Sequence, residues 1–255
     1  MKRDGAYAHL ADYYEYLCDD CDYKRWSQYF VRLLRRGLFG ENAEEHSLQG
    51  RKGIDFGCGN GIFSRALSRE GCLMTGVDVS AQMLSVAEEK AREEGLRITF
   101  LQGDVARFRA TEKYDFAIAA NDVLNYVPKD KLFSAAKSAA AALRPGGVFV
   151  TDISSKNKFL NKINGQVSAD DREDITYLSF GKVTGDVAVL DVTLFVRRAD
   201  GAFTRFDEVH TQYVYEAEEI CAALDKAGFE VLLAEGMYGE DGRIADRLCF
   251  LAKKK

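Results

Sequence analysis

From residue 51 onward, the hydrophobic positions of this chain alternate between two patterns. Short apolar runs of strand length, such as "CLMTGVDV" and "YDFAIAAN", are followed by segments whose apolar residues recur at helical spacing. Strands that alternate with helices are typical of βαβ units, in which the strands form a parallel sheet. The pattern therefore predicts an α/β fold whose first five strands lie at residues 51–57, 72–79, 98–104, 114–121 and 148–154.

Single residues indicate where the helices begin and end. Ser80 is a typical N-cap, and Gly95 is expected to end the helix that Ser80 begins. Pro145, in "RPGG", is expected to end another helix before the fifth strand. Upstream of the sheet, the apolar residues from Trp26 to Leu34 follow the spacing of a buried helical face. We therefore expect two helices to precede the sheet.

The pattern changes after residue 154. Residues 173–215 indicate extended, antiparallel segments, and "ADGA" at 199–202 contains the Asp-Gly pair of a hairpin turn. A helix and two further strands, "FEVLLAEG" and "RLCFLAKK", then follow. The chain is therefore expected to form a doubly wound, seven-stranded, mostly parallel sheet of Rossmann-like type, interrupted by an antiparallel β insertion.

Composition limits the functional classes. The chain is 47% hydrophobic, has no apolar stretch long enough to span a membrane, and lacks the apolar centre of a signal peptide, so a soluble, cytoplasmic protein is expected. Its formal net charge of -5 argues against a nucleic-acid partner. The six cysteines are scattered and are expected to be reduced. Cys18 and Cys21 lack the second pair of a zinc site, so no metal is expected.

A glycine-rich turn follows the first strand. In "IDFGCGNG" at 54–61, Gly57, Gly59 and Gly61 would let a ligand touch the main chain, and the following helix N-terminus favours anionic groups. A dinucleotide fingerprint needs G-x-G-x-x-G, but Ile62 stands where its last glycine would be. The departure weakens a nicotinamide interpretation.

Two aspartates end the next two strands. Asp78 can accept hydrogen bonds from both hydroxyls of a ribose. Asp104 can accept one from an exocyclic amine, while Val105 covers a flat ring. Each residue alone could equally cap a helix or a turn. Their order and placement at strand ends together indicate a nucleoside-binding crevice.

These segments are similar to those of a known family. "IDFGCGNG", "GVDVS", "LQGDV", "NDVLNYV" and "LRPGGVFV" resemble the class I S-adenosylmethionine-dependent methyltransferases from about residue 51 to 154. The flanking segments look like a small-molecule-type bacterial branch whose substrates are largely unassigned. The resemblance implies the strand order 3-2-1-4-5-7-6, with strand 7 antiparallel. The expected parts are N-terminal helices that close over the cofactor (1–50), the cofactor-binding core (51–154), a β-rich lid (155–215), and a last helix with two strands (216–255).

The resemblance also implies how S-adenosyl-L-methionine is held. Asp55 and the glycine turn would hold the methionine part, Asp78 would take the ribose, and Asp104 would read the adenine edge. Asn121 begins the loop where the family places groups that border the methyl. The implied cofactor set is Tyr7, Tyr14, Asp55, Gly57, Gly59, Asp78, Val79, Met83, Asp104, Val105 and Asn121. Asn60 replaces the threonine common in the family's "GCGTG", which affects one fine contact.

The β insertion supplies a candidate general base, His210. If the Asp-Gly pair of residues 199–202 forms a two-residue turn, Asp191 lies opposite His210. Thr193, Glu208 and Gln212 then lie on the same face. A carboxylate beside an imidazole raises the imidazole's pKa and orients it for proton transfer. The alternative is a solvated polar strand face.

The N-terminal tyrosines offer a second group of candidates. Tyrosines 7, 13, 14 and 16 could line an acceptor pocket, with cation-π contacts to an amine, or could be core residues. Tyr14 joins His210 as a catalytic candidate. His9 and His46 have no comparable context and are expected to be structural or exposed.

The resulting hypothesis is methyl transfer to a small-molecule N or O nucleophile. Displacement at a sulfonium needs alignment and exclusion of water more than it needs a metal. "NDVLNYV" lacks the D/N-P-P-Y signature of DNA-base amino-methyltransferases. Two alternatives stay open: a non-catalytic S-adenosylmethionine-binding or partner protein and, less favoured, a nicotinamide-dependent oxidoreductase. The sequence does not indicate an oligomeric state.

Overall fold

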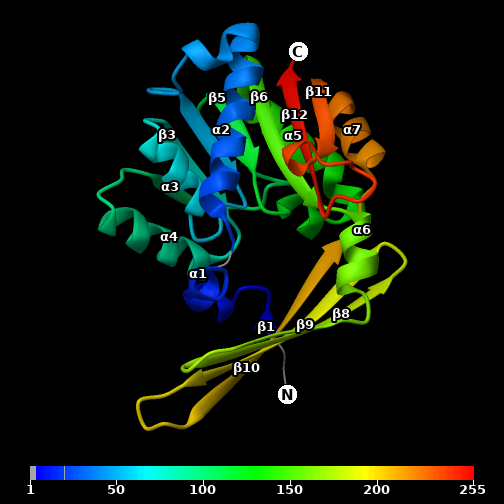
Figure 1. The fold of residues 1–255 in the computed structure, drawn as a ribbon. Helices are drawn as coiled ribbons and strands as arrows, with labels where there is room; N and C mark the ends of the chain where they lie inside the picture. The colour runs from blue at the N-terminus through cyan, green and yellow to red at the C-terminus, as the bar shows by residue number, and fades with distance from the viewer. Residues whose placement is uncertain (1–3, 20) are drawn as a thin grey trace.

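The computed structural model describes residues 4–19 and 21–255, which form two sheets (Figure 1). The larger sheet has seven strands, and all of them run parallel except β12, which is antiparallel to both of its neighbours. This arrangement confirms the predicted α/β fold and its strand order. In spatial order the strands are β11 (Phe229–Gly236), β12 (Arg247–Lys254), β6 (Leu143–Ser154), β5 (Tyr114–Ala119), β2 (Lys52–Phe56), β3 (Leu73–Asp78) and β4 (Thr99–Gln102).

The fifth predicted strand starts earlier than expected. β6 begins directly after the preceding helix, and Leu143 already pairs with Tyr114 of β5. The β5–β6 register then shifts between Tyr114 and Phe116. Pro145 therefore lies near the start of a strand, where a missing N–H donor is tolerated.

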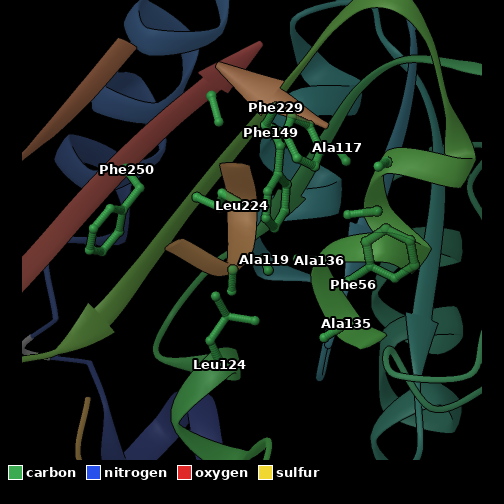
Figure 2. Packing of buried hydrophobic residues seen from close by; sticks show 14 of the residues in the cluster. Phe56, Ala117, Ala119, Leu124, Ala135, Ala136, Phe149, Leu224, Phe229 and Phe250 are labelled. Carbon is green, nitrogen blue, oxygen red and sulfur yellow. The ribbon is translucent and has the colours of Figure 1, made fainter. Parts of the chain in front are cut away.

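Helices cover both faces of this sheet. On one face, α2 (Tyr23–Phe39) and α3 (Ile62–Arg69) bury Phe30, Leu34 and Leu67. On the other, α5 (Leu132–Ala142) and α7 (Ala217–Lys226) pack against the sheet phenylalanines shown in Figure 2. The remaining helical elements are α1 (Tyr14–Leu17), α4 (Ala81–Glu93), α6 (Lys156–Lys158), the 3₁₀ segments η1 (Leu10–Tyr13), η2 (Gly40–Glu45), η3 (Val123–Tyr126), η4 (Lys129–Lys131) and η6 (Met237–Gly239), and the π-helical η5 (Phe159–Ile163).

Side-chain caps fix the starts of the helices near the site. The Ser80 hydroxyl accepts the backbone N–H of Met83 at 3.2 Å, so the predicted cap of α4 is confirmed. At α2, Asp22 accepts the N–H of Arg25 at 2.9 Å. Among residues 4–19 and 21–255, no helix combines the length and apolarity that crossing a bilayer requires.

The smaller sheet lies beyond the carboxyl ends of the parallel strands (Figure 1). Apart from the β1–β10 pair, which is parallel, its neighbouring strands are antiparallel. The chain enters it through α6 after β6 and returns from it to α7. That this sheet acts as a lid stays a prediction. Its order is β1 (Asp4–Gly5), β10 (Phe203–Tyr213), β9 (Val187–Arg197), β8 (Ile175–Thr184) and β7 (Val167–Asp171).

The predicted register of the β9–β10 hairpin is wrong by one residue. Arg198 and Ala202 close the loop through an N–H to carbonyl bond of 2.7 Å, so three residues rather than two form the turn. His210 therefore lies opposite Leu190, and Asp191 lies opposite Val209. A shift of one residue moves a side chain to the other face of a strand pair, which separates Asp191 from His210.

Candidate active site

A cavity of about 460 Å³ lies where the turns after β2, β3, β4 and β5 meet. Tyr7 and Tyr14 of the N-terminal segment complete its lining. All eleven residues of the expected cofactor set border this one space. Their binding roles stay predictions, but the fold brings their positions together.

The glycine turn presents main chain to the cavity. Gly57, Gly59 and Gly61 have φ angles of 67°, 53° and 79°, a left-handed region that favours glycine. A Cβ on Gly57 would lie 2.5 Å from Val123, which leaves no room for any side chain. Beside Gly59, by contrast, a Cβ would meet only the Met83 sulfur, at 4.0 Å, so a ligand can approach the backbone there. The first N–H groups of α3 have no intrahelical partner and suit an anionic group.

Two carboxylates support this turn. Asp78 accepts the N–H of Gly59 with one oxygen and that of Ser80 with the other, each at 2.8 Å. Each oxygen keeps a lone pair that can accept from a ribose hydroxyl. Asp55 is 1% exposed and accepts the Ser64 hydroxyl at 2.6 Å. Burial raises the pKa of Asp55 to about 7 against that hydrogen bond, and the charge of Asp78 adds to the rise.

The end of β4 supplies the opposite part of the lining. Asp104 accepts the N–H of Ala106 at 2.8 Å with one oxygen, and the other oxygen of this half-exposed side chain lies 3.9 Å from Nε of Arg107. Val105 lies beside it, and the buried Met83 lines the same cavity. A carboxylate beside apolar side chains can bind the amino edge and the face of a purine.

A strained turn follows β5. Asn121 and Asp122 have φ angles of 66° and 55°, which are uncommon for residues other than glycine. The Asp152 carboxylate accepts both of their N–H groups, at 2.7 and 3.1 Å. Arg247 donates to Asp152, to Asp122 at 3.0 Å and to the Asn121 side chain at 3.3 Å. This arrangement directs the Asn121 amide to the Tyr14 hydroxyl, 2.6 Å away.

A second cavity, of about 590 Å³, lies against the smaller sheet. Its lining comes from the N-terminal segment, η3, the α6–η5 connection and strands β7 to β10. Tyr7, Tyr14 and Tyr126 line both cavities, so they form a shared wall. The Tyr7 ring lies 5.8 Å from the Tyr14 ring and 5.9 Å from the Tyr126 ring. The two cavities therefore adjoin at these three side chains.

His210 lies in the second cavity at the end of a hydrogen-bonded chain. Its Nε2 is 3.0 Å from Glu208, the partner that replaces the predicted Asp191, and its Nδ1 is 3.2 Å from the Tyr126 hydroxyl. Tyr126 and Tyr7 are joined at 3.0 Å through their hydroxyls. Because a carboxylate only accepts, His210 donates through Nε2, and in the neutral imidazole Nδ1 then accepts from Tyr126. Burial raises the pKa of Tyr126 well above 10, so this tyrosine stays protonated.

Glu208 also holds the N-terminal segment. Its fully buried carboxylate accepts the backbone N–H groups of Tyr7 at 2.9 Å, of Leu10 at 2.9 Å and of His9. Burial raises the pKa of Glu208, but the hydrogen bonds from His210, His9 and Leu10 outweigh it and leave that pKa below its ordinary value. One carboxylate thus orients the candidate base and fixes the segment that covers the first cavity.

The other histidines lie outside both cavity linings: His9 contacts Asp4 and Phe206, and His46 stacks on Phe39. Within residues 4–19 and 21–255, no three His, Cys, Asp or Glu side chains are grouped to hold a metal ion. Tyr126 was not among the predicted site residues, although it stands in "NDVLNYV", five residues after Asn121.

The chain is similar to known methyltransferases. Residues 54–147 match the protein family described as "Methyltransferase domain". A protein of Geobacillus sp. (strain WCH70) that is named as a methyltransferase is 28% identical over 254 residues, which cover 97% of this chain and 99% of that protein. A crystal structure of an S-adenosylmethionine-dependent methyltransferase from Clostridium acetobutylicum ATCC 824 is similar, with a TM-score of 0.82, 26% identity and 97% of each chain covered. The sugar N-methyltransferase KedS8 from Streptoalloteichus sp ATCC 53650 shares the fold, with a TM-score of 0.80, 22% identity, and 100% of this chain and 96% of that chain covered.

Proposed function

We propose, from the premise that this chain is an S-adenosylmethionine-dependent methyltransferase, that it methylates a nitrogen or oxygen of a small molecule by in-line displacement. The observation that carries this proposal is the pair of cavities with a shared wall. The donor would occupy the first cavity, and the acceptor would occupy the second. A cavity of about 590 Å³ lies in the usual range for small-molecule sites.

The shared wall is where the reacting atoms would meet. Displacement requires the acceptor lone pair in line with the methyl carbon and the sulfur, at about 3–3.5 Å from the carbon. Tyr14, held by the Asn121 amide, and Tyr126 border both spaces and would align the methyl group. Burial raises the pKa of Tyr14, so it also acts as a neutral hydroxyl.

The hydrogen-bonded chain behind this wall suits proton removal. A hydroxyl acceptor loses its proton as its new bond to carbon forms, and an ammonium must lose one proton beforehand to free its lone pair. Tyr126 can accept that proton while passing its own to Nδ1 of His210, and the resulting imidazolium is stabilised by Glu208. Since both nitrogens of His210 are engaged, we assign it the role of a base that acts through Tyr126.

Donor binding is tested by thermal unfolding with S-adenosylhomocysteine against NAD. A ligand selective for the folded state raises the melting temperature, so S-adenosylhomocysteine should raise it and NAD should not. A rise with NAD alone would favour the nicotinamide alternative and contradict the proposal.

Proton transfer is tested with His210→Ala and Tyr126→Phe, on acceptors found by screening for S-adenosylhomocysteine release. Each variant should lower kcat by about 10²-fold or more at neutral pH, with the S-adenosylhomocysteine Kd unchanged. His46→Ala, which lies away from both cavities, is the matched control. Unchanged kcat in His210→Ala would remove the assigned base.

A further inference from the structure

Among the residues that the structure describes, four with charged side chains at neutral pH line the second cavity, apart from its histidine. Three of them have an oppositely charged partner in direct contact: Asp122 with Arg247, Asp170 with Arg172, and Lys162 with Asp246. The fourth is Lys158 of α6, whose ammonium donates to the Ser154 hydroxyl at 3.1 Å. Within residues 4–19 and 21–255, no carboxylate oxygen lies within 4 Å of that ammonium.

Lys158 is poorly compensated at its position. Burial lowers the pKa of Lys158, the positive charge of Arg247 lowers it further, and the more distant carboxylates do not restore it. Three carboxylates, Asp122, Asp246 and Asp152, act on Lys158 from a distance. Asp246, however, contacts Lys162, and Asp122 and Asp152 contact Arg247 directly, while Asp152 also accepts two backbone N–H groups. An isolated, partly desolvated ammonium in a cavity wall is costly unless a ligand supplies the opposite charge.

We propose that the second cavity takes acceptors that carry an oxyanion, a carboxylate or a phosphate, which the Lys158 ammonium binds. The nucleophile of the same molecule would then face the tyrosine wall, at Tyr126. A cationic group on the acceptor is disfavoured because the two carboxylates of the lining, Asp122 and Asp170, are already paired with arginines. This substrate class rests on the proposed function, which assigns the second cavity to the acceptor.

The test uses thermal unfolding of the full chain saturated with S-adenosylhomocysteine. Sodium acetate and sodium phosphate are compared with sodium chloride at equal ionic strength. At an oxyanion concentration ten times its Kd, binding should raise the melting temperature by about 3–6 °C relative to the sodium chloride sample. The acetate and phosphate arms separate a carboxylate site from a phosphate site.

The increment should disappear in Lys158→Gln and Lys158→Met and persist in Lys158→Arg. Lys182→Gln, which changes an exposed lysine of β8, should keep it. No oxyanion increment in the wild-type protein would overturn the proposal, and so would an increment that survives in Lys158→Gln or Lys158→Met. The rise caused by S-adenosylhomocysteine itself shows that each variant is folded. Its absence in the wild-type protein would instead count against the proposed function.

Discussion

Asp55 illustrates how burial prepares a single residue for a charged ligand. It is the next-to-last residue of β2, which directly precedes the glycine turn, and burial raises its pKa to about 7. Near neutral pH the ligand-free protein therefore holds this carboxyl as a mixture of protonated and ionised forms. A cation bound beside it would favour the ionised form and displace the proton.

We predict that the affinity for S-adenosylhomocysteine depends on pH through Asp55. If the ammonium of S-adenosylhomocysteine contacts the Asp55 carboxylate, binding below pH 7 must release the proton from Asp55. The affinity should therefore fall as the pH drops from 7 to 5.5, by up to about tenfold per pH unit. Calorimetry in two buffers of different ionisation enthalpy measures the released proton. Asp55→Asn should bind more weakly and without this slope, while Asp104→Asn should keep it. A wild-type affinity constant over that range would exclude the contact.

At the scale of elements, the hairpin of the smaller sheet shows where local pattern is insufficient. The strands and the Asp-Gly turn were predictable, but the loop length was not. Asp200 accepts the N–H of Ala202 at 3.0 Å and pairs with Arg198, and Gly201 has a φ of 83°, which favours the three-residue loop. The register then places Glu208 and His210 on the buried face, where donors from residues 7–10 meet them. Those donors lie about 200 positions away in the chain and leave no local signal.

We predict that Glu208→Gln loosens the N-terminal segment. The amide keeps the size of the carboxylate but turns one acceptor oxygen into a donor, so a backbone N–H of Tyr7, His9 or Leu10 loses its partner. Unfolding should become easier by about 1–3 kcal/mol, and amide exchange at residues 7–10 should accelerate more than in the sheet core. Glu230→Gln, an exposed change on β11, serves as the control. Equal exchange in Glu208→Gln and wild type would show that this carboxylate does not hold the segment.

For the whole molecule, the two cavities differ in how far the sequence reveals them. The first is built mainly from loops that follow consecutive strands, so all of the eleven expected positions except Tyr7 and Tyr14 stand at fixed places in βα units, and all eleven border it. The second is assembled from the N-terminal segment, η3, α6 and the smaller sheet. Lys158 and Arg247 carry no motif, and only tertiary packing gives them their partners. The lining of the first cavity was therefore predictable, and that of the second required the structure.

The shared wall leads to a prediction about coupling between the parts. Tyr7 and Tyr14 line the donor cavity, and Tyr7 is bound through its backbone to Glu208 of β10. When the donor binds and fixes these tyrosines, it should therefore also stabilise the N-terminal segment and β10. Neither of these segments belongs to the glycine turn. Hydrogen exchange with and without S-adenosylhomocysteine should show protection at residues 4–17 and 203–213 as well as at residues 54–61. In Tyr7→Phe, the donor cavity keeps its ring and the backbone bond remains, so protection should persist, whereas Glu208→Gln should confine protection to the core loops. Protection confined to residues 54–61 in the wild-type protein would mean that the donor site and the smaller sheet are not coupled.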